Sequence, residues 1–370
     1  MDNFADISIA SRPFGEWQST DPEREVAVLM SGGVDSSTTA LLLQRRGWRV
    51  LGITMEIPVA EGCSYAGTCC GGQAAVVSHH LGIPHYFLDT DAAFRELVIE
   101  RFRQSYQRGY TPNPCADCNE LLKFRAVWDF IEQQFGVYYL ATGHYAQVRN
   151  ENGTPLLSRG EDTSRDQSYF IYGVPRNRIP HLLLPMGTLA KDEVRRIAAD
   201  AAIPVADRAD SMELCFAGED NYRKALKEAA MQPGDIVNLE GECLGRHNGI
   251  ENYTVGQRRG LGIAAGEPLY VIKLCPEDNT VVVGTREQAF QSRVKAVELN
   301  VLMPESMTPG IELLGKIRSY SSPAACNLVN VKDDRMTVEF QTPQFGPAPG
   351  QRLVLYDEEG HVVAGGRISA

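Results

Sequence analysis

The sequence lacks any long hydrophobic run. No stretch of about 18 consecutive apolar residues occurs, which excludes a membrane-spanning helix of ordinary length. The opening segment "MDNFADISIASRPFGEW" has acidic side chains and no apolar core, so we expect a short, loosely ordered lead-in and not a secretory signal. Basic charge is also scarce, because 36 Lys and Arg face 47 Asp and Glu, for a net charge of −11. This argues against a generally basic nucleic-acid binder but permits a local basic track.

The cysteine content excludes a disulfide scaffold. Nine cysteines are an odd number in a chain without an export signal, so we expect a cytoplasmic protein whose cysteines are buried, reactive or metal-binding. Cys243, Cys275 and Cys326 stand alone in the sequence and are typical of small buried hydrophobic residues.

The order of elements predicts three domains. Short apolar runs such as "EVAVLM" alternate with helical segments, which predicts a doubly wound parallel sheet that binds ligands at the carboxyl ends of its strands. Beyond about residue 225, short β-runs separated by turns such as "PEDN" and "DEEGH" dominate. We predict an α/β domain at residues 1–225, a small β-rich domain at 226–290 and a C-terminal β-barrel at 291–370.

The segment "VLMSGGVDSS" joins the first buried strand to its helix. Its glycines allow close approach of the backbone to an anion, and the helix start offers N–H groups and a positive dipole end. A plain glycine-rich turn capped by Asp35 and Ser36 is the alternative interpretation. A Gly-Lys-Ser/Thr sequence is absent, so this is not a Walker A loop. The position after the first strand favours pyrophosphate binding.

This loop resembles that of the ATP pyrophosphatases, which adenylate a substrate and then displace AMP with a nucleophile. The resemblance sharpens because further blocks follow in order: "TPNPCADCNELLKF", "ATGHYAQV", "RDQSYF", "LPMGTLAKDEVRRIA", "ADSMELCFAGE", "YTVGQRRGLGI" and "PGQRLVLYDEEGHVVAGGRI". Together they resemble the tRNA-specific 2-thiouridylase family, from about residue 25 to the end of the chain. The resemblance implies an adenine nucleotide alpha hydrolase-like fold. It also implies that the protein is a tRNA-uridine 2-sulfurtransferase.

The resemblance also implies site residues. The positions that lie along ATP are Leu29, Met30, Ser31, Gly32, Gly33, Val34, Asp35, Ser36, Met55 and Gly143. The positions that match tRNA contacts are Asn113, Pro114, His144, Arg165, Asp166, Gln167, Arg318, Ser319 and Gln351. A buried structural histidine is the alternative for His144. The implied cofactors are ATP and Mg²⁺, the latter held mainly by the phosphates.

Sulfur transfer requires cysteines that are distant in sequence but close in space. In the family, the cysteine matching Cys215 carries the incoming sulfur as a persulfide, and the one matching Cys118 releases it, ending in a transient disulfide. The implied partners are tRNA and a sulfur-donor protein, a cysteine desulfurase or a sulfur carrier.

Cys115 is a departure from the family, many of whose members have aspartate there. With Cys118 and Cys215 it makes a set of three thiols, which suits a [4Fe–4S] cluster with one open iron. A metal-free persulfide relay stays open, as does zinc, although a structural zinc site usually has four ligands. Cys63, Cys69 and Cys70 are either incidental surface thiols or further sulfur carriers.

The segments "QRRGLG" and "KIRSYSS" are candidates for contacts with tRNA phosphates and bases, although the second has serine where tyrosine is common in the family. Two other functions fit the same fold. An amide-forming ligase would not need Cys118 and Cys215, and a non-enzymatic iron–sulfur tRNA-binding sensor would not turn ATP into AMP.

Overall fold

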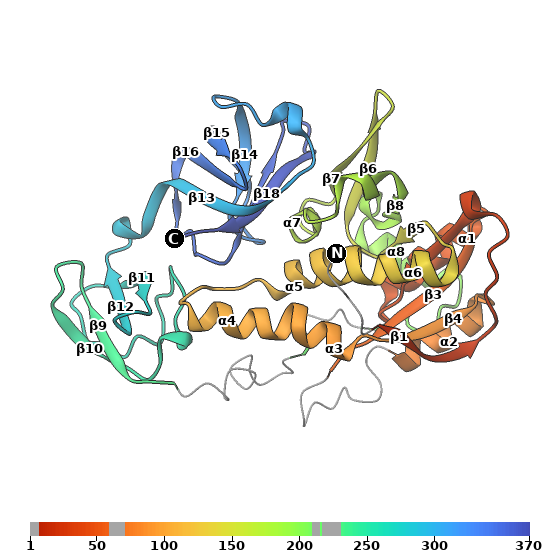
Figure 1. Ribbon diagram of the computed structural model, residues 1–370, viewed down its shortest axis with the longest axis horizontal. Coiled ribbons are helices and arrows are strands. Elements are labelled where there is room, and N and C mark those ends of the chain that lie inside the picture. Colours follow the sequence, from red (N-terminus) through yellow and green to blue (C-terminus); the bar gives the residue numbers. More distant parts are fainter. Residues whose placement is uncertain (1–6, 59–70, 209–214, 217–230) are drawn as a thin grey trace. The chain divides into compact units, whose positions relative to one another are not determined.

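The structure is a computed structural model that describes residues 7–58, 71–208, 215–216 and 231–370. It divides into two compact units (Figure 1). The first contains Met1–Val98 and Cys115–Asn221, and the second contains Ile99–Pro114 and Tyr222–Ala370. No helix in the described ranges has both the length and the apolar character that crossing a bilayer requires.

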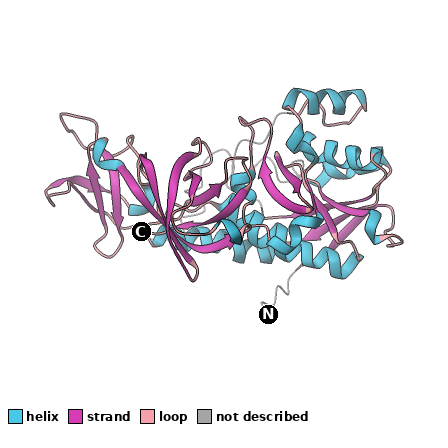
Figure 2. Ribbon diagram, turned by 90° about the horizontal axis from the view of Figure 1, so that it is seen from above, coloured by secondary structure: helices cyan, strands magenta, loops and turns pink. Residues whose placement is uncertain are grey.

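The first unit is built on a mostly parallel sheet with the strand order β1-β4-β3-β2-β5-β8. Its strands are β1 (Ser8–Phe14), β2 (Glu25–Leu29), β3 (Arg49–Glu56), β4 (His85–Asp89), β5 (Tyr139–Ala141) and β8 (Leu182–Leu183), with a separate hairpin of β6 (Ala146–Glu151) and β7 (Thr154–Arg159). Figure 2 shows helices on both sides of this sheet. Every residue of β2 is buried, as expected for a central parallel strand.

Seven α-helices accompany this sheet within the described residues. They are α1 (Val34–Arg45), α2 (Gly71–Leu81), α3 (Asp91–Phe94), α5 (Pro114–Asp117), α6 (Trp128–Phe135), α7 (Ser168–Ile171) and α8 (Lys191–Asp200). Helices α1 and α2 contact the strands of the sheet. Helices α1 and α8 pack on each other, and their buried residues Ala40, Leu43, Val194 and Ala198 join Val26 and Val28 of β2 in one core.

One detail differs from the sequence expectations. The N-terminal segment is not merely a loose lead-in, because β1 pairs antiparallel with β4 at the edge of the sheet. Strand β5 ends at Ala141, and residues 142–145 then turn toward α1. Two π-helical segments continue short α-helices: η2 (Arg95–Glu100) follows α3, and η3 (Cys118–Val127) joins α5 to α6.

The second unit contains α4 (Arg101–Gln107), a β-sheet and a closed barrel. The sheet consists of β9 (Gly234–Val237), β10 (Cys243–His247), β11 (Tyr270–Cys275) and β12 (Thr280–Gly284). The barrel consists of β13 (Phe290–Val301), β14 (Glu312–Lys316), β15 (Ala324–Lys332), β16 (Arg335–Phe345), β17 (Arg352–Tyr356) and β18 (Val362–Ile368). The hairpins predicted at "PEDN" and "DEEGH" are confirmed by the β11–β12 and β17–β18 pairings.

The turn before β17 holds the chain just ahead of the cysteine pair. Thr111 donates its N–H to the carbonyl oxygen of Pro349 at 2.7 Å. Gln351 donates from Nε2 to the carbonyl oxygens of Thr111 at 3.1 Å and Pro112 at 3.2 Å. A Cβ on Gly350 would lie 2.8 Å from the carbonyl oxygen of Thr111, so only glycine fits this approach. We call these contacts the 349–351 strap.

Replacing Gly350 by alanine tests the strap, with Gly310→Ala as a matched control. Both glycines have positive φ, +95° and +90°, but a Cβ at Gly310 meets no atom within 4 Å. Both variants should lose about 1–2 kcal/mol to the left-handed backbone, and Gly350→Ala should lose a further ~1–3 kcal/mol to overpacking. Equal losses in urea unfolding would show that the close approach to Thr111 does not constrain the fold.

Candidate active site

The phosphate loop forms a tight connection between β2 and α1. Gly32 has φ +73°, a conformation that glycine adopts without strain. The hydroxyl of Ser36 accepts the N–H of Ser31 at 3.2 Å, and that of Ser37 donates to the carbonyl oxygen of Gly33 at 2.8 Å. Hydrogen bonds between its own residues therefore fix the loop, and the N-terminus of α1 is available for an anion.

The end of β5 lies directly against the first turn of α1. A Cβ on Gly143 would lie 2.8 Å from the backbone nitrogen of Ser36 and 3.0 Å from the carbonyl carbon of Asp35. Any larger residue at position 143 would push the two segments apart. This contact explains why glycine follows the strand and why His144 and Tyr145 lie beside the phosphate loop.

Asp35 is fixed by two partners from distant parts of the chain. Lys191, which is 7% exposed, donates from Nζ to both carboxylate oxygens, at 2.7 Å and 2.8 Å. The hydroxyl of Tyr145 donates to Oδ1 at 2.8 Å. Lys191 is the first residue of α8, where the helix dipole disfavours a cation, so the ion pair offsets an unfavourable position.

A further arginine pair links the phosphate loop to the chain ahead of Cys215. Arg195 on α8 donates to the carbonyl oxygens of Ala206 at 3.1 Å and Arg208 at 3.0 Å. Arg208 in turn donates to the carbonyl oxygen of Gly32 at 3.3 Å. The segment that leads toward Cys215 is therefore tied to the loop on which an anion would bind.

A pocket of about 300 Å³ lies at the carboxyl ends of β2 and β3. Of the residues predicted from the sequence, it is lined by Leu29, Met30, Ser31, Asp35, Ser36, Met55, Cys118, Gly143, His144, Gln167 and Cys215. Residues that the sequence did not single out complete it: Ile53, Thr54, Ile57, Phe94, Lys123 and Thr142. The structure thus brings Cys118 and Cys215 to the same pocket as the phosphate loop.

Lys123 supplies positive charge beside the buried thiol. Cys118 opens η3, and its side chain is buried. Burial raises the pKa of the Cys118 thiol, and the charge of Lys123 opposes that rise. Lys123 donates from Nζ to Oδ1 of Asn119 at 2.9 Å, which fixes its position in the pocket. The sequence signal for Lys123 was a single cation within the apolar run "LLKF".

His144 is neutral in the pocket. Burial and, to a smaller extent, the charge of Lys123 lower its pKa to about 3. Its Nδ1 forms a hydrogen bond with the hydroxyl of Thr142 at 2.8 Å. His144 can therefore exchange hydrogen bonds with a ligand at neutral pH, but it does not offer a positive charge.

Other predicted residues lie outside the pocket lining. Gly32, Gly33 and Val34 form the phosphate loop and the start of α1. Arg165 is exposed, whereas the Asp166 carboxylate is buried and accepts hydrogen bonds from Arg159 and from the N–H groups of Gly160 and Ser168. Asn113 and Pro114 are buried, and Cys115 is exposed. Cys63, Cys69 and Cys70 lie outside the described residues.

In the second unit, two predicted tRNA contacts have structural partners. Gln351 belongs to the 349–351 strap. Arg318 donates from its guanidinium to the carbonyl oxygens of Val255 at 2.9 Å and Gly346 at 2.6 Å, and its neighbour Ser319 is partly exposed. Of the isolated cysteines, Cys326 is buried as expected, Cys275 is half-buried and Cys243 is exposed, which corrects the expectation of burial for Cys243.

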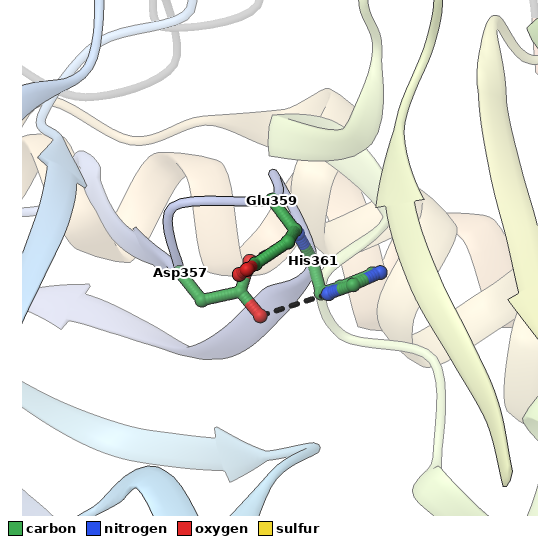
Figure 3. Close-up of side chains that lie close together, drawn as sticks. All are labelled: Asp357, Glu359 and His361. Atoms are coloured by element: carbon green, nitrogen blue, oxygen red, sulfur yellow. Dashed lines mark hydrogen bonds and ion pairs between the residues drawn. The ribbon is translucent and has the colours of Figure 1, made fainter. Parts of the chain in front are cut away.

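A second group of potential metal ligands lies in the β17–β18 turn (Figure 3). Ligand atoms of Asp357, Glu359 and His361 lie within 4.8 Å of one another. Asp357 accepts the backbone N–H of His361 at 2.8 Å, and its other oxygen hydrogen-bonds Nδ1 of His361 at 2.8 Å. These bonds explain the group as a clamp of the turn, so we assign it no ligand.

Comparison with known proteins matches the whole architecture. Three family models match in succession: "tRNA methyl transferase HUP domain" at residues 24–219, "tRNA methyl transferase PRC-barrel domain" at 224–285 and "Aminomethyltransferase beta-barrel domain" at 291–368. The tRNA-specific 2-thiouridylase MnmA of Pelotomaculum thermopropionicum is 43% identical over 343 residues, 90% of this chain and 94% of that protein. The chain belongs to the tRNA-specific 2-thiouridylase family.

This membership confirms the family, its enzyme class as a tRNA-uridine sulfurtransferase, and the fold class predicted from the sequence. The tRNA-specific 2-thiouridylase MnmA of Rickettsia felis is 40% identical over 362 residues, 94% of this chain and 98% of that protein. A solved structure, the U34-tRNA thiolase NcsA from Methanococcus maripaludis with its [4Fe-4S] cluster, is 18% identical with a TM-score of 0.34 over 52% of this chain and 60% of that one. A likeness this low carries no argument about chemistry.

Replacing Lys191 by methionine should loosen the phosphate loop of this family member. Asp35 would keep its charge with only the Tyr145 hydroxyl as partner, so we expect a stability loss of roughly 1–3 kcal/mol and weaker ATP binding. Lys191→Arg keeps the charge and should retain most of both, and Lys332→Met on the exposed barrel surface is the control. Calorimetry of ATP binding measures the effect, and an unchanged affinity in Lys191→Met would contradict it.

Two histidines with lowered pKa values, His85 and His144, should make the fold sensitive to acid. Burial lowers the pKa of His85 to about 4 and that of His144 to about 3, against an ordinary value of 6.5. Because the folded state favours the neutral rings, this stability is fully present above pH 6.5 and is lost as the pH falls toward the folded pKa values. In NMR titrations, the two rings, assigned with glutamine variants, should not titrate above pH 5. A midpoint near 6.5 for either ring would contradict its lowered pKa.

Proposed function

We propose that the protein catalyses ATP-dependent 2-thiolation of the wobble uridine of tRNA through an adenylated uridine. The observation that supports this best is the convergence of Cys118 and Cys215, far apart in sequence, on the pocket that contains Asp35 and Ser36 of the phosphate loop. The proposal further assigns ATP to the loop residues predicted above and Mg²⁺ to its phosphates.

The first step activates the uridine. Its O2 oxygen attacks the α-phosphorus of ATP, a new O–P bond forms, and pyrophosphate leaves. The phosphate loop and the N-terminus of α1 would hold the departing pyrophosphate, with Asp35 kept in place by Lys191 and Tyr145. A neutral His144 suits this step, because it can accept or donate a hydrogen bond to the base without attracting the phosphates. Oxide is a poor leaving group, whereas the adenylated oxygen leaves as AMP.

The second step transfers sulfur. A sulfur-donor protein, a cysteine desulfurase or a sulfur carrier, loads Cys215 with a persulfide, and the terminal sulfur attacks C2 of the uridine while AMP leaves with the former O2. The Cys118 thiolate then attacks the Cys215 sulfur, breaks the S–S bond to the transferred atom and leaves C2=S on the base. The resulting Cys118–Cys215 disulfide needs an external thiol reductant before the next turnover. Lys123 would favour the Cys118 thiolate.

A [4Fe–4S] cluster is the alternative sulfur carrier. Cys115, Cys118 and Cys215 are its candidate ligands, and the first two lie three residues apart on consecutive helical segments. Within the described ranges, their sulfur atoms are not among the groups whose ligand atoms lie within 4.8 Å of one another, which argues against a single zinc ion. Three cysteine thiols are the donor type that would hold such a cluster. The cluster would supply an open iron able to hold a sulfide.

The proposal also covers the domains, the tRNA contacts and the cellular compartment. We propose a catalytic domain at 1–225, a central β-rich domain at 226–290 and a tRNA-binding barrel at 291–370, acting in the cytoplasm. The target uridine must leave the anticodon loop to reach the pocket, which costs little energy in a single strand. The predicted tRNA contacts at Asn113, Pro114, Arg165 and Ser319 belong to this proposal.

Cys215→Ser distinguishes thiolation from its rivals. Wild-type protein with tRNA, ATP, a sulfur donor and a reductant should release AMP and form thiolated tRNA. Cys215→Ser and Cys118→Ser should lower thiolation at least about 100-fold, because each removes a reacting group. Cys243→Ser, an exposed cysteine outside the pocket, is the matched control. If Cys215→Ser releases AMP as fast as the wild type, an amide-forming ligase is supported. If the wild type binds tRNA but releases no AMP, a non-enzymatic sensor is supported.

Purification without oxygen, applied to the wild type and to Cys115→Ser, separates the two sulfur mechanisms. An iron count near four per chain and a visible absorption band, both lost in Cys115→Ser, would support the cluster. Iron-free protein that thiolates tRNA at the full rate would leave the persulfide relay.

A further inference from the structure

Tyr320 stands apart from the other apolar side chains of the surface. Its side chain is 99% exposed, whereas the remaining large exposed hydrophobic residues among the described ones range from 38% to 50%. It lies in the connection between β14 and β15 of the barrel. An isolated exposed hydrophobic residue is ordinary, but a fully solvated aromatic ring on a fixed turn is not.

The turn that carries Tyr320 is held closed. Ser321 donates both its backbone N–H, at 3.2 Å, and its hydroxyl, at 2.9 Å, to the carbonyl oxygen of Arg318. This is a β-turn with Ser319 and Tyr320 as its central residues. The ring is therefore presented from a backbone that already has its hydrogen bonds, so little conformational entropy is lost when the ring contacts a ligand.

The side chain of Arg318 anchors this turn to two other loops. Its guanidinium bonds the carbonyl oxygens of Val255 and Gly346. A Cβ on Gly256 would lie 3.0 Å from Nη2 of Arg318, and one on Gly346 would lie 3.2 Å from it. Both glycines thus leave space for the guanidinium. Arg318, one of the predicted tRNA contacts, thus also supports the turn.

The same anchor brings the turn to a basic segment. Val255 lies three residues before Arg258, and both Arg258 and Arg259 are exposed. The anchor of the Tyr320 turn thus reaches the loop that continues into the two exposed arginines. An exposed aromatic ring and exposed guanidinium groups are the side chains that RNA-binding surfaces use, because bases stack on aromatic side chains and phosphates pair with arginine. A ring that binds another protein is usually surrounded by apolar side chains, because the core of such an interface is apolar. The residues on either side of Tyr320 are serines, which favours RNA.

We propose that Tyr320 stacks on an unpaired base of the tRNA, and that Arg318 is the positioning residue that holds its turn. This inference rests on the proposed function, since it names a residue that the tRNA would meet. It also explains how the barrel keeps an aromatic contact although serine occupies position 319.

Binding of unmodified tRNA to the full chain, measured without ATP or sulfur donor, tests the proposal. Tyr320→Ala should weaken binding about 5- to 150-fold, the range expected for one base–aromatic stack, while Tyr320→Phe stays within about twofold. Tyr138→Ala, an exposed tyrosine of the first unit, is the matched control and should bind like wild type. Unchanged unfolding midpoints would show that the variants fold.

Salt dependence separates stacking from charge. The loss in Tyr320→Ala should be the same factor at 50 and 200 mM salt, whereas Arg258→Ala should lower the slope of log affinity against log salt by about 1. In Tyr320→Trp, added tRNA should quench the new indole fluorescence, and Arg318→Met should reduce that quenching by loosening the turn. Tyr320→Phe should preserve affinity because the ring face, not the hydroxyl, makes the contact.

Three results would overturn the inference. They are equal tRNA affinity of Tyr320→Ala and wild type, an indole that tRNA does not quench, and a loss in Tyr320→Phe as large as in Tyr320→Ala. Normal tRNA affinity with impaired transfer from a protein donor would reassign the ring to a protein contact. Wild type that binds tRNA through Tyr320 yet thiolates nothing would contradict the proposed function and leave this inference intact.

Discussion

The absence of a side chain at residue 143 is the constraint on which the site depends. With glycine there, the end of β5 reaches the backbone of Asp35 and Ser36 closely enough that a Cβ would collide. Strand β5 is the neighbour of β2 in the sheet, and β2 leads into the phosphate loop. His144 and Tyr145, which follow β5, can therefore lie beside the loop. From this contact follow the hydrogen bond of Tyr145 to Asp35 and the place of His144 in the pocket wall. The carboxyl ends of two parallel strands become one site.

Charged and neutral side chains lie in different parts of the pocket around that contact. The carboxylate of Asp35 is compensated by Lys191, so the loop can face an anionic nucleotide without a bare negative charge. On the cysteine side, Lys123 is the cation, and it acts on a buried thiol whose pKa burial has raised. His144 stays neutral nearby. The pocket therefore combines an anion-binding end with a thiol end, as expected if one substrate is activated at the first and attacked at the second.

The sequence predicts the parts of this arrangement that are local. The strand–loop–helix at 25–45, the short spacing of Cys115 and Cys118, and the hairpin turns are all signalled by neighbouring residues. Contacts between distant residues are not. Lys191 meets Asp35 across 156 residues, and the only local hint is a cation at the start of a helix. Strand β1 has no clear alternation and becomes ordered by pairing with β4. Arg318 and Gln351 bond to backbone carbonyl oxygens of residues far away in the sequence, and no neighbouring residue signals these bonds.

The 349–351 strap has a consequence for dissecting the protein. Because residues 99–114 pack with the second unit, the first unit is interrupted along the chain, and its two pieces are joined through a segment that belongs elsewhere. A fragment cut near residue 221 would keep Thr111 and Pro112 but lose Pro349 and Gln351, the groups that hold them. The backbone just before Cys115 would then be unsupported. A cut near residue 221 therefore separates the segment that leads into Cys115 from its hydrogen-bond partners in the second unit.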